Sequence, residues 1–261
     1  MAPTTVPATT VIPTTVPPTI ASQPTVPATT TAAPAGTDAA DASAGATLAV
    51  GGQVTGCASV GHIGDSLSVG LESPDFLVDP DDRIDARYRH VGVEQVRVDS
   101  SGGRSVVEMV AGQPNAESAA RSMLAEGHDG CWVFALGTND AANRAVGSGY
   151  DAWDRIAIMM EIAGDRPVLW VNVRTLRDSG PYADAEMQVF DRALLEACAS
   201  YPNLRIYDWA GEVDDAWFQD DWIHLTSRGY AEMADRIALA LAAAFPASDA
   251  PSASCVIRTG G

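Results

Sequence analysis

Short apolar runs alternate with segments of helical spacing along most of the chain, and this alternation restricts the fold more than any other feature. The runs CWVFALG (131–137) and PVLWVNV (167–173) are apolar almost throughout, which is typical of strands buried on both faces. Alternation of such strands with helical segments predicts an α/β domain with a mainly parallel sheet. We expect strands at 59–64, 93–98, 131–137, 167–173 and 204–209, and helices at 115–126, 150–163, 183–199 and 228–245.

The first part of the chain has a different composition. From Ala2 to Pro34 it consists almost entirely of Thr, Pro, Ala and Val, and the first charged side chain is Asp38. Such a segment cannot bury a core and should stay extended. We therefore predict a disordered stalk or linker at 1–56 and a folded domain at 57–261. A tail without function is the alternative interpretation of the first segment.

Stalks rich in Thr and Pro typically hold an exported domain away from a membrane or cell wall. The N-terminus MAPTTVPATT has neither the basic nor the apolar region of a signal peptide. We therefore expect an extracellular or cell-surface protein whose native export signal is not present in this chain.

Charge and composition exclude several classes of function. The formal net charge is −18, so we expect no nucleic acid and no anionic membrane surface as a partner, because the field of the protein would repel both. The chain has no Lys, which excludes Ser–Lys dyads, Schiff-base catalysis and phosphate-binding P-loops. It also lacks the run of about 20 apolar residues that a membrane-spanning helix needs.

Polar clusters follow four of the expected strands. GDSLS follows the first strand, DSSGGRS the second and GTND the third, and DDWIH comes shortly after the fifth. The carboxyl ends of parallel strands gather at one edge of a sheet, where functional groups collect in open α/β folds. The four clusters should therefore meet at that edge.

One combination of these residues meets the requirements of nucleophilic catalysis. A serine hydroxyl becomes a nucleophile when an imidazole accepts its proton and a carboxylate orients that imidazole. Asp221 and His224 lie three residues apart, so the carboxylate can meet the ring and leave its other nitrogen for Ser66. GDSLS alone leaves an ordinary turn as the alternative. His62, which lies within a strand, should be a packed core histidine.

Acyl transfer also needs preorganised hydrogen-bond donors for the developing oxyanion. The candidates are the backbone N–H groups of Ser66 and Gly103 and the side-chain amide of Asn139. A glycine suits the second position because the substrate carbonyl must approach the main chain closely there. For Asn139, a plain helix N-cap is the alternative role.

The ordered blocks GDS, GG, GTND and DxxH resemble those of the SGNH hydrolases, also called GDSL esterases, over about residues 57–245. This resemblance implies a flavodoxin-like three-layer α/β/α fold with a mainly five-stranded parallel sheet. It implies Ser66 as nucleophile, Asp221 and His224 as the rest of the triad, and Gly103 and Asn139 as oxyanion donors. Gly102 is an alternative to Gly103. The sequence GxSxG is absent, so an ordinary α/β-hydrolase elbow is not indicated.

The stalk and DSSGGRS also resemble extracellular SGNH domains attached to bacterial cell-wall O-acetyltransferases. The leading hypothesis is a secreted or surface-tethered serine esterase that cleaves short O-acyl esters, such as acetyl, on carbohydrate through an acyl-enzyme on Ser66. The alternatives are an O-acetyltransferase that receives acetyl from a membrane acyl-donor protein, and a non-catalytic glycan-binding module. We expect a monomer that needs no metal or organic cofactor and acts on an O-acylated carbohydrate or small ester.

Substrate contacts are assigned to Asp65 and Trp222, with inward packing as the alternative for Trp222. The insertion at 71–90 should border the site. Its aromatic residues Phe76 and Tyr88 either contact a glycan or cover the sheet.

The four cysteines lack CxxC spacing and any nearby histidine with the spacing of a metal ligand, so a zinc site is not expected. Their even number suits two disulfides in an exported protein, with four buried thiols as the alternative. All four precede strands or follow helices, which places them at the sheet edge opposite the polar clusters. The expected pairs are Cys57–Cys255, which would tie the ends of the domain together, and Cys131–Cys198.

Overall fold

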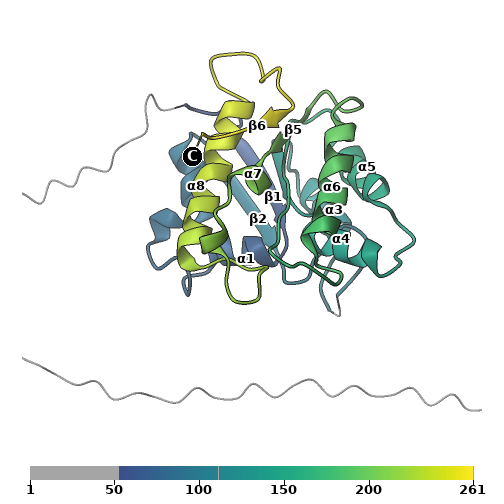
Figure 1. Cartoon of the computed structure of the whole chain (residues 1–261). Coiled ribbons are helices and arrows are strands. Elements are labelled where there is room, and N and C mark those ends of the chain that lie inside the picture. The colour runs from purple at the N-terminus through teal and green to yellow at the C-terminus, as the bar shows by residue number, and fades with distance from the viewer. Residues whose placement is uncertain (1–52, 111, 261) are drawn as a thin grey trace, which may run out of the picture. The chain divides into compact units, whose positions relative to one another are not determined.

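A six-stranded, all-parallel sheet forms the centre of the folded unit (Figure 1). The computed structural model describes residues 53–110 and 112–260, so the predicted stalk at 1–52 lies outside the described residues. The strand order is β2-β1-β3-β4-β5-β6. The strands are β1 (Ser59–Gly64), β2 (Gln95–Ser100), β3 (Cys131–Ala135), β4 (Val168–Val171), β5 (Leu204–Tyr207) and β6 (Val256–Ile257).

Helices cover both faces of this sheet, so the predicted three-layer α/β/α architecture is confirmed. One core cluster joins the sheet to α1 (Ser66–Glu72), α2 (Ile84–His90), α7 (Trp209–Glu212) and α8 (Ser227–Ala244). The other joins it to α3 (Ala116–Ala125), α4 (Thr138–Ala145), α5 (Ala152–Ala163) and α6 (Asp184–Ala197). Two short 3-10 helices are η1 (Pro80–Asp82) and η2 (Asp215–Trp217). None of the described helices is long and apolar enough to span a membrane.

The continuous apolar runs are buried on both faces, as predicted. In β3, Trp132 and Phe134 pack in one core cluster while Val133 packs in the other, because successive side chains of a strand point to opposite faces. β4 repeats this pattern with Trp170 on one face and Leu169 on the other. The expected strands and helices all form, with bounds that differ by up to two residues for most of them.

The sixth strand is absent from the prediction. β6 consists of two residues at the C-terminal end of the chain, and it lengthens the sheet beyond β5. Its backbone pairing includes hydrogen bonds from Ile206 N to Cys255 O (2.8 Å) and from Asp208 N to Ile257 O (3.0 Å). Two residues are too few to show a strand periodicity, so no sequence pattern indicated this element.

The predicted disulfide pairing is wrong, although both bonds exist. Cys57 is bonded to Cys131 (Cα–Cα 5.7 Å), and Cys198 to Cys255 (Cα–Cα 6.2 Å). The strand order explains the pairing. β1 and β3 are neighbours, with Val60 opposite Cys131, whereas Cys255 precedes β6 at the far edge of the sheet. The four cysteines do lie at the amino ends of the strands, as expected.

The described chain begins just ahead of β1. Thr55 is buried, and its amide donates to Val91 O (2.8 Å) while its hydroxyl donates to Phe245 O (2.9 Å). Three residues that the prediction assigned to the linker, Val54, Thr55 and Gly56, are therefore hydrogen-bonded to the folded unit.

Candidate active site

Ser66 is the first residue of α1, directly after β1. The preceding residue, Asp65, is the N-cap of this helix and accepts a hydrogen bond from Leu67 N (2.9 Å). Gly64 is needed before it, because a Cβ at this position would lie 1.9 Å from Ser68 Oγ. The Gly-Asp-Ser sequence therefore ends the strand, caps the helix and places the Ser66 hydroxyl at the carboxyl edge of the sheet.

The structure brings Ser66, Asp221 and His224 together. His224 Nε2 lies 2.9 Å from Ser66 Oγ, and His224 Nδ1 lies 2.6 Å from Asp221 Oδ2. With the ring neutral, Nδ1–H donates to the carboxylate and Nε2 accepts from the serine hydroxyl. This is the arrangement that activates a serine nucleophile.

Asp221 remains a carboxylate near neutral pH. Burial by itself would raise its pKa, but the hydrogen bonds from the His224 ring and from the backbone amides of Ile223 and His224 outweigh burial and lower it. Those amides donate to the other carboxylate oxygen at 3.0 and 2.9 Å. The carboxylate is thus fixed by its own turn while it orients the imidazole.

The loop that carries Asp221 and His224 is closed at its base. Phe218 and Leu225 form an antiparallel bridge, and Thr226 caps α8 immediately afterwards. Trp222 lies within this loop and has a φ of +65°, the only positive φ of a non-glycine residue in 53–110 and 112–260. Its backbone N donates to Gln219 O (2.9 Å), and its indole is 50% exposed, so the alternative of inward packing does not hold.

Asn139 occupies the first turn of α4, where its side chain is buried. Its Nδ2 donates to Arg104 O (3.0 Å) and lies 3.4 Å from Asp65 Oδ2, while its Oδ1 accepts from Tyr182 OH (3.1 Å). The helix N-cap is Gly137, so the alternative role of Asn139 as a plain N-cap is wrong. The amide therefore lies beside the residue that precedes Ser66.

Gly103 lies in the turn after β2. Its φ of +73° is a conformation that favours glycine, whereas Gly102 has no such requirement. The turn is tied to the end of β1, because Ser101 N donates to Gly64 O (3.3 Å). The buried Arg104 guanidinium donates to Asp99 O (2.5 Å) and pairs with Asp99 Oδ1 (2.7 Å). The loops after β1, β2 and β3 thus meet around Ser66.

The predicted substrate contact through Asp65 disagrees with its position. The residue is 1% exposed, and its two carboxylate oxygens face Leu67 N and Asn139 Nδ2. Burial raises the pKa of Asp65 to about 7. Asp65 therefore joins the start of α1 to Asn139 within the protein.

His62 and the aromatic residues of the 71–90 insertion belong to the core rather than to the site. His62 is fully buried between Tyr88 OH (2.7 Å from Nδ1) and Ser68 Oγ (2.8 Å from Nε2), which confirms the packed core histidine. Burial lowers its pKa to about 3. Tyr88 is also fully buried and Phe76 packs against Tyr230 (ring centroids 4.9 Å), so the aromatic residues of the 71–90 insertion cover the sheet.

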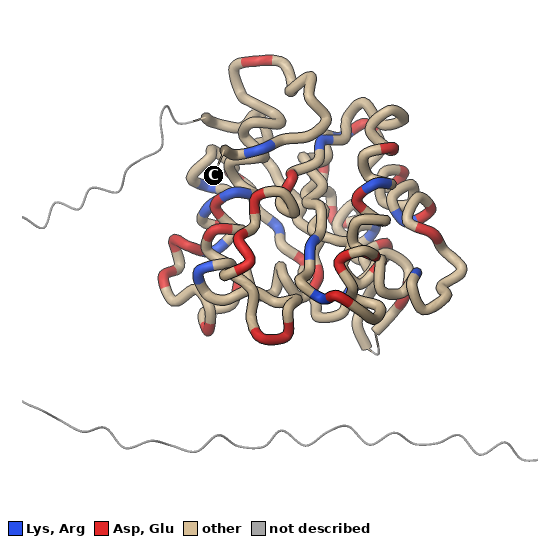
Figure 2. The backbone as a smooth tube through the Cα atoms, in the orientation of Figure 1, with Lys and Arg blue, Asp and Glu red and all other residues tan. Residues whose placement is uncertain are grey.

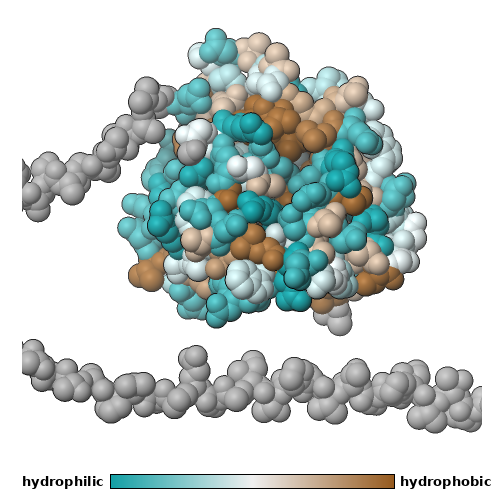
Figure 3. All heavy atoms as spheres, in the orientation of Figure 1, coloured by the Kyte–Doolittle hydropathy of each residue, from teal (hydrophilic) through white to brown (hydrophobic). Residues whose placement is uncertain are grey.

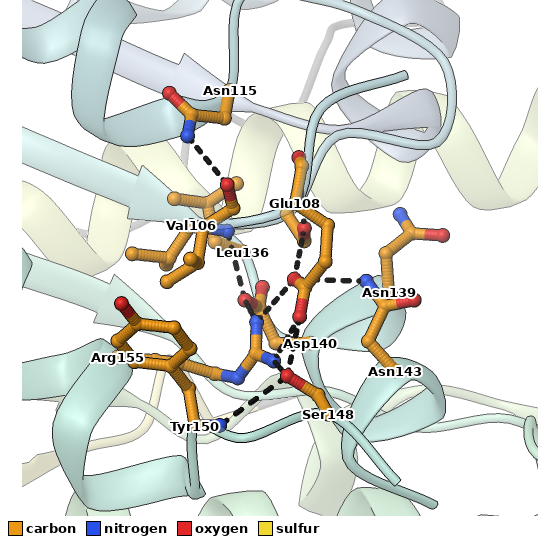
Figure 4. A network of polar contacts seen from close by, with 12 residues as sticks. Val106, Glu108, Asn115, Leu136, Asn139, Asp140, Asn143, Ser148, Tyr150 and Arg155 are labelled. Carbon is orange, nitrogen blue, oxygen red and sulfur yellow. Dashed lines mark hydrogen bonds and ion pairs between the residues drawn. The ribbon is translucent and has the colours of Figure 1, made fainter. Parts of the chain in front are cut away.

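Sequence reasoning missed a group of buried charges next to Asn139 (Figure 4). Arg155 on α5 is fully buried and contacts both Asp140 and Glu108. No local signature marks these residues, since the arginine lies 47 positions from the glutamate.

Comparison with known proteins gives matches in structure but none in sequence. No family model matches the chain, and no curated protein matches it. A lipase/acylhydrolase from Enterococcus faecalis is 20% identical, with a TM-score of 0.55 over 74% of this chain and 100% of that one. Est24, a carbohydrate acetylesterase from Sinorhizobium meliloti, is 16% identical, with a TM-score of 0.53 over 69% of this chain and 96% of that one. These likenesses and the sheet order confirm the fold expected from the GDS, GTND and DxxH blocks: this chain has the fold of the SGNH hydrolases.

Proposed function

We propose that this protein is a serine esterase that removes short O-acyl groups, such as acetyl, from carbohydrate. One observation carries the proposal: a single imidazole, that of His224, lies within hydrogen-bond distance of both Ser66 Oγ and the Asp221 carboxylate. A turn residue without a catalytic role has no need of this arrangement.

The geometry gives each group a step in the reaction. Ser66 Oγ attacks the ester carbonyl as His224 Nε2 accepts its proton, and Asp221 stabilises the resulting imidazolium. The oxyanion receives hydrogen bonds from the backbone N–H groups of Ser66 and Gly103 and from Asn139 Nδ2. His224 then returns the proton to the departing alcohol, which leaves an acyl group on Ser66. Water activated by His224 attacks this acyl-enzyme and releases the acid.

The surface near the triad supports a carbohydrate substrate. Trp222 is half-exposed and lies two residues before His224 in the same loop, and we assign its indole the role of a platform for the sugar ring. Est24 is named a carbohydrate acetylesterase, and it shares the fold of this chain. The two disulfides support an extracellular location. The division into a stalk and a catalytic domain belongs to the same proposal, with the domain beginning ahead of Thr55 rather than at Cys57, because Thr55 and Gly56 are hydrogen-bonded to it. Action as a monomer is also part of the proposal.

The decisive assay is the hydrolysis of p-nitrophenyl acetate with and without a chito-oligosaccharide acceptor. Ser66→Ala should reduce kcat by about 1000-fold or more. Ser68→Ala is the matched control, because Ser68 also contacts a histidine, the fully buried His62, but this pair has no carboxylate. It should retain most of the turnover.

The products distinguish the alternatives. Release of acetate that does not depend on the acceptor identifies an esterase. Acetylated oligosaccharide identifies an acyltransferase, since a sugar hydroxyl then replaces water as the attacking group. Binding of the oligosaccharide without any turnover that depends on Ser66 would contradict the enzyme and indicate a glycan-binding module.

A further inference from the structure

A buried ionic network lies behind the oxyanion donors. We call Arg155, Glu108, Asp140 and Ser148 the Arg155 network (Figure 4). Arg155 Nη1 donates to Asp140 Oδ1 (2.9 Å) and Glu108 Oε2 (2.6 Å), and its Nη2 donates to Glu108 Oε1 (2.5 Å) and Ser148 Oγ (2.8 Å). One guanidinium therefore joins three segments of the chain that approach α5.

Such a network is costly to bury. The side chains of Arg155 and Asp140 are both fully inaccessible to solvent, and removal of charges from water is unfavourable unless they are closely paired. The arginine and the hydroxyls of Ser148 and Ser105 lower the pKa of Glu108 to about 2, against the opposing effect of its burial. Apolar side chains of similar volume would often stabilise a core equally well or better. The retention of charges here suggests a role in fixing geometry.

The network contacts both arms of the proposed oxyanion hole. Asp140 directly follows Asn139 in α4, and its Oδ1 accepts the Val106 amide (2.8 Å). Val106 lies on the segment that carries Gly103, and on this segment Arg104 O accepts from Asn139 Nδ2 (3.0 Å). The Glu108 carboxylate also accepts from Asn143 Nδ2 (3.1 Å), one turn further along the same helix. The segment 101–108 and α4 are thus joined at several points, and Arg155 binds both.

We propose that Arg155 is a positioning residue that holds the turn of Gly103 and the Asn139 amide at the spacing required to bind the oxyanion. This inference rests on the proposed function. Arg155 itself touches no reacting atom; it acts through Glu108 and Asp140. Small displacements of catalytic groups have large kinetic effects, since a misplacement of about 1 Å can reduce the rate about 100-fold.

Two variants test the proposal with p-nitrophenyl acetate. Arg155→Met removes the guanidinium, and Glu108→Gln removes one charge at a carboxylate that is one-third exposed and therefore more tolerant of change. We expect kcat to fall about 10- to 100-fold for Arg155→Met and somewhat less for Glu108→Gln, with KM changed less than about twofold. If Arg155→Met does not fold, Glu108→Gln decides the result.

Two further variants separate positioning from loss of stability. Arg155→Lys keeps the positive charge, so its kcat should be higher than that of Arg155→Met. It should stay below the wild-type kcat, because lysine cannot form the paired hydrogen bonds of the guanidinium. Arg205→Met removes a half-buried arginine that donates to Ser252 O (2.6 Å) and Pro202 O (2.8 Å) at the opposite edge of the sheet. It should lower the melting temperature and leave kcat unchanged.

Hydrogen exchange gives a readout that is independent of turnover. In Arg155→Met and Glu108→Gln, the amides of 101–108 should exchange faster, while those of β1 and β3 keep their protection. Unchanged exchange in this segment would overturn the proposal. So would a loss of kcat in Arg155→Met that is no greater than the loss in Arg205→Met at the same loss of stability. Failure of the proposed function can be distinguished from failure of this inference. If the turnover of the wild-type protein equals that of Ser66→Ala, the proposed function is wrong, and the role of Arg155 is then rejected with it.

Discussion

At the scale of single residues, Trp222 combines two unusual properties. A positive φ costs a non-glycine residue roughly 1 kcal/mol or more, so it persists only where the surroundings impose it. Here two hydrogen bonds hold the backbone of Trp222: its N–H donates to Gln219 O, and its carbonyl accepts from Leu176 N. The indole gains little from packing, since half of it is exposed. The strain is therefore consistent with a ring held for contact with substrate.

Replacement of this residue separates stability from recognition. In Trp222→Gly we expect a free energy of unfolding about 0.5–1 kcal/mol higher, because glycine adopts this φ without strain. We also expect kcat/KM to fall about fivefold for acetylated chito-oligosaccharide and much less for p-nitrophenyl acetate, because stacked aromatic contacts contribute about 1 kcal/mol. Chemical denaturation and steady-state kinetics measure the two effects.

Trp153→Ala is the control, since this indole on α5 is also partly exposed but lies outside the site. It should leave kcat/KM unchanged for both acetylated chito-oligosaccharide and p-nitrophenyl acetate. A less stable Trp222→Gly protein with the same preference between the two substrates would show that the indole serves the fold alone.

The residues of the candidate site differ in how far the sequence revealed them. Asp221 and His224 are predictable because their contact is local, and Ser66 because its motif follows a strand. Arg155, Glu108 and Asp140 are not predictable, because each looks like an ordinary charged residue until the fold buries it. Asp65 shows the opposite error, since an acidic residue in a motif was assigned to substrate and instead caps a helix.

At the scale of elements, long and strongly patterned segments were predictable and short ones were not. β3 and β4 have continuous apolar runs, and α8 has eighteen residues with one buried face. β6 has two residues and depends on its neighbour, β5, for all its pairing. The disulfide partners follow from strand order, which the sequence does not display, so the cysteines could be placed at one edge but not paired.

β6 also covers part of the hydrophobic core at the outer side of β5. A pocket of about 570 Å³ beside it is lined by the apolar residues Leu195, Ile206 and Val256 together with polar and charged residues such as Asp191 and Arg258. Figure 3 shows an apolar patch over β5 and β6. The Cys198–Cys255 disulfide joins the end of α6 to the start of this strand. The bond therefore keeps a two-residue strand on the sheet.

Removal of that bond should loosen β6. For Cys198→Ser/Cys255→Ser we expect a free energy of unfolding about 3 kcal/mol lower, because the bond closes a long loop in the unfolded chain. Binding of a hydrophobic dye should rise as Ile206 becomes accessible, while kcat on p-nitrophenyl acetate stays within about twofold because the site lies at the other strand ends. Calorimetry, dye fluorescence and kinetics test this. Unchanged stability, or a loss of kcat without dye binding, would contradict it.

At the scale of the whole molecule, negative charge dominates. The formal net charge is −18, and acidic positions along the backbone outnumber arginine positions (Figure 2). Burial reduces this excess in the folded protein near neutral pH, because it raises the pKa of Asp65 and Asp191 to about 7 and that of Asp140 to about 6. In the unfolded chain these carboxyl groups titrate near their ordinary values, about 4. Between pH 8 and pH 6.5 the folded protein thus binds more protons than the unfolded chain.

Stability should therefore increase as the pH falls from 8 to 6.5, since the state that binds more protons is favoured. Below about pH 6.5 buried His62 offsets part of this gain, because its pKa is lowered to about 3 and it stays neutral in the folded protein while the unfolded chain takes up its proton. Melting temperatures in matched buffers test this dependence.

Asp191→Asn supplies the control. Its side chain can still accept from Val173 N, as Asp191 Oδ1 does at 3.1 Å, but it no longer carries a charge. The variant should gain stability at pH 8 and little at pH 5, which flattens the profile. If the melting temperature of the wild-type protein rises steadily from pH 6.5 to 8, these buried carboxyl groups do not determine the pH dependence of its stability.

The Cys57–Cys131 bond has a mechanical consequence. A pulling force applied to the chain ahead of Cys57 passes through this covalent bond directly into β3, in the middle of the sheet. The force therefore does not break the hydrogen bonds between β1 and its neighbouring strands one after another. A force on the chain ahead of Cys57 would therefore have to break a covalent bond before it could unravel β1.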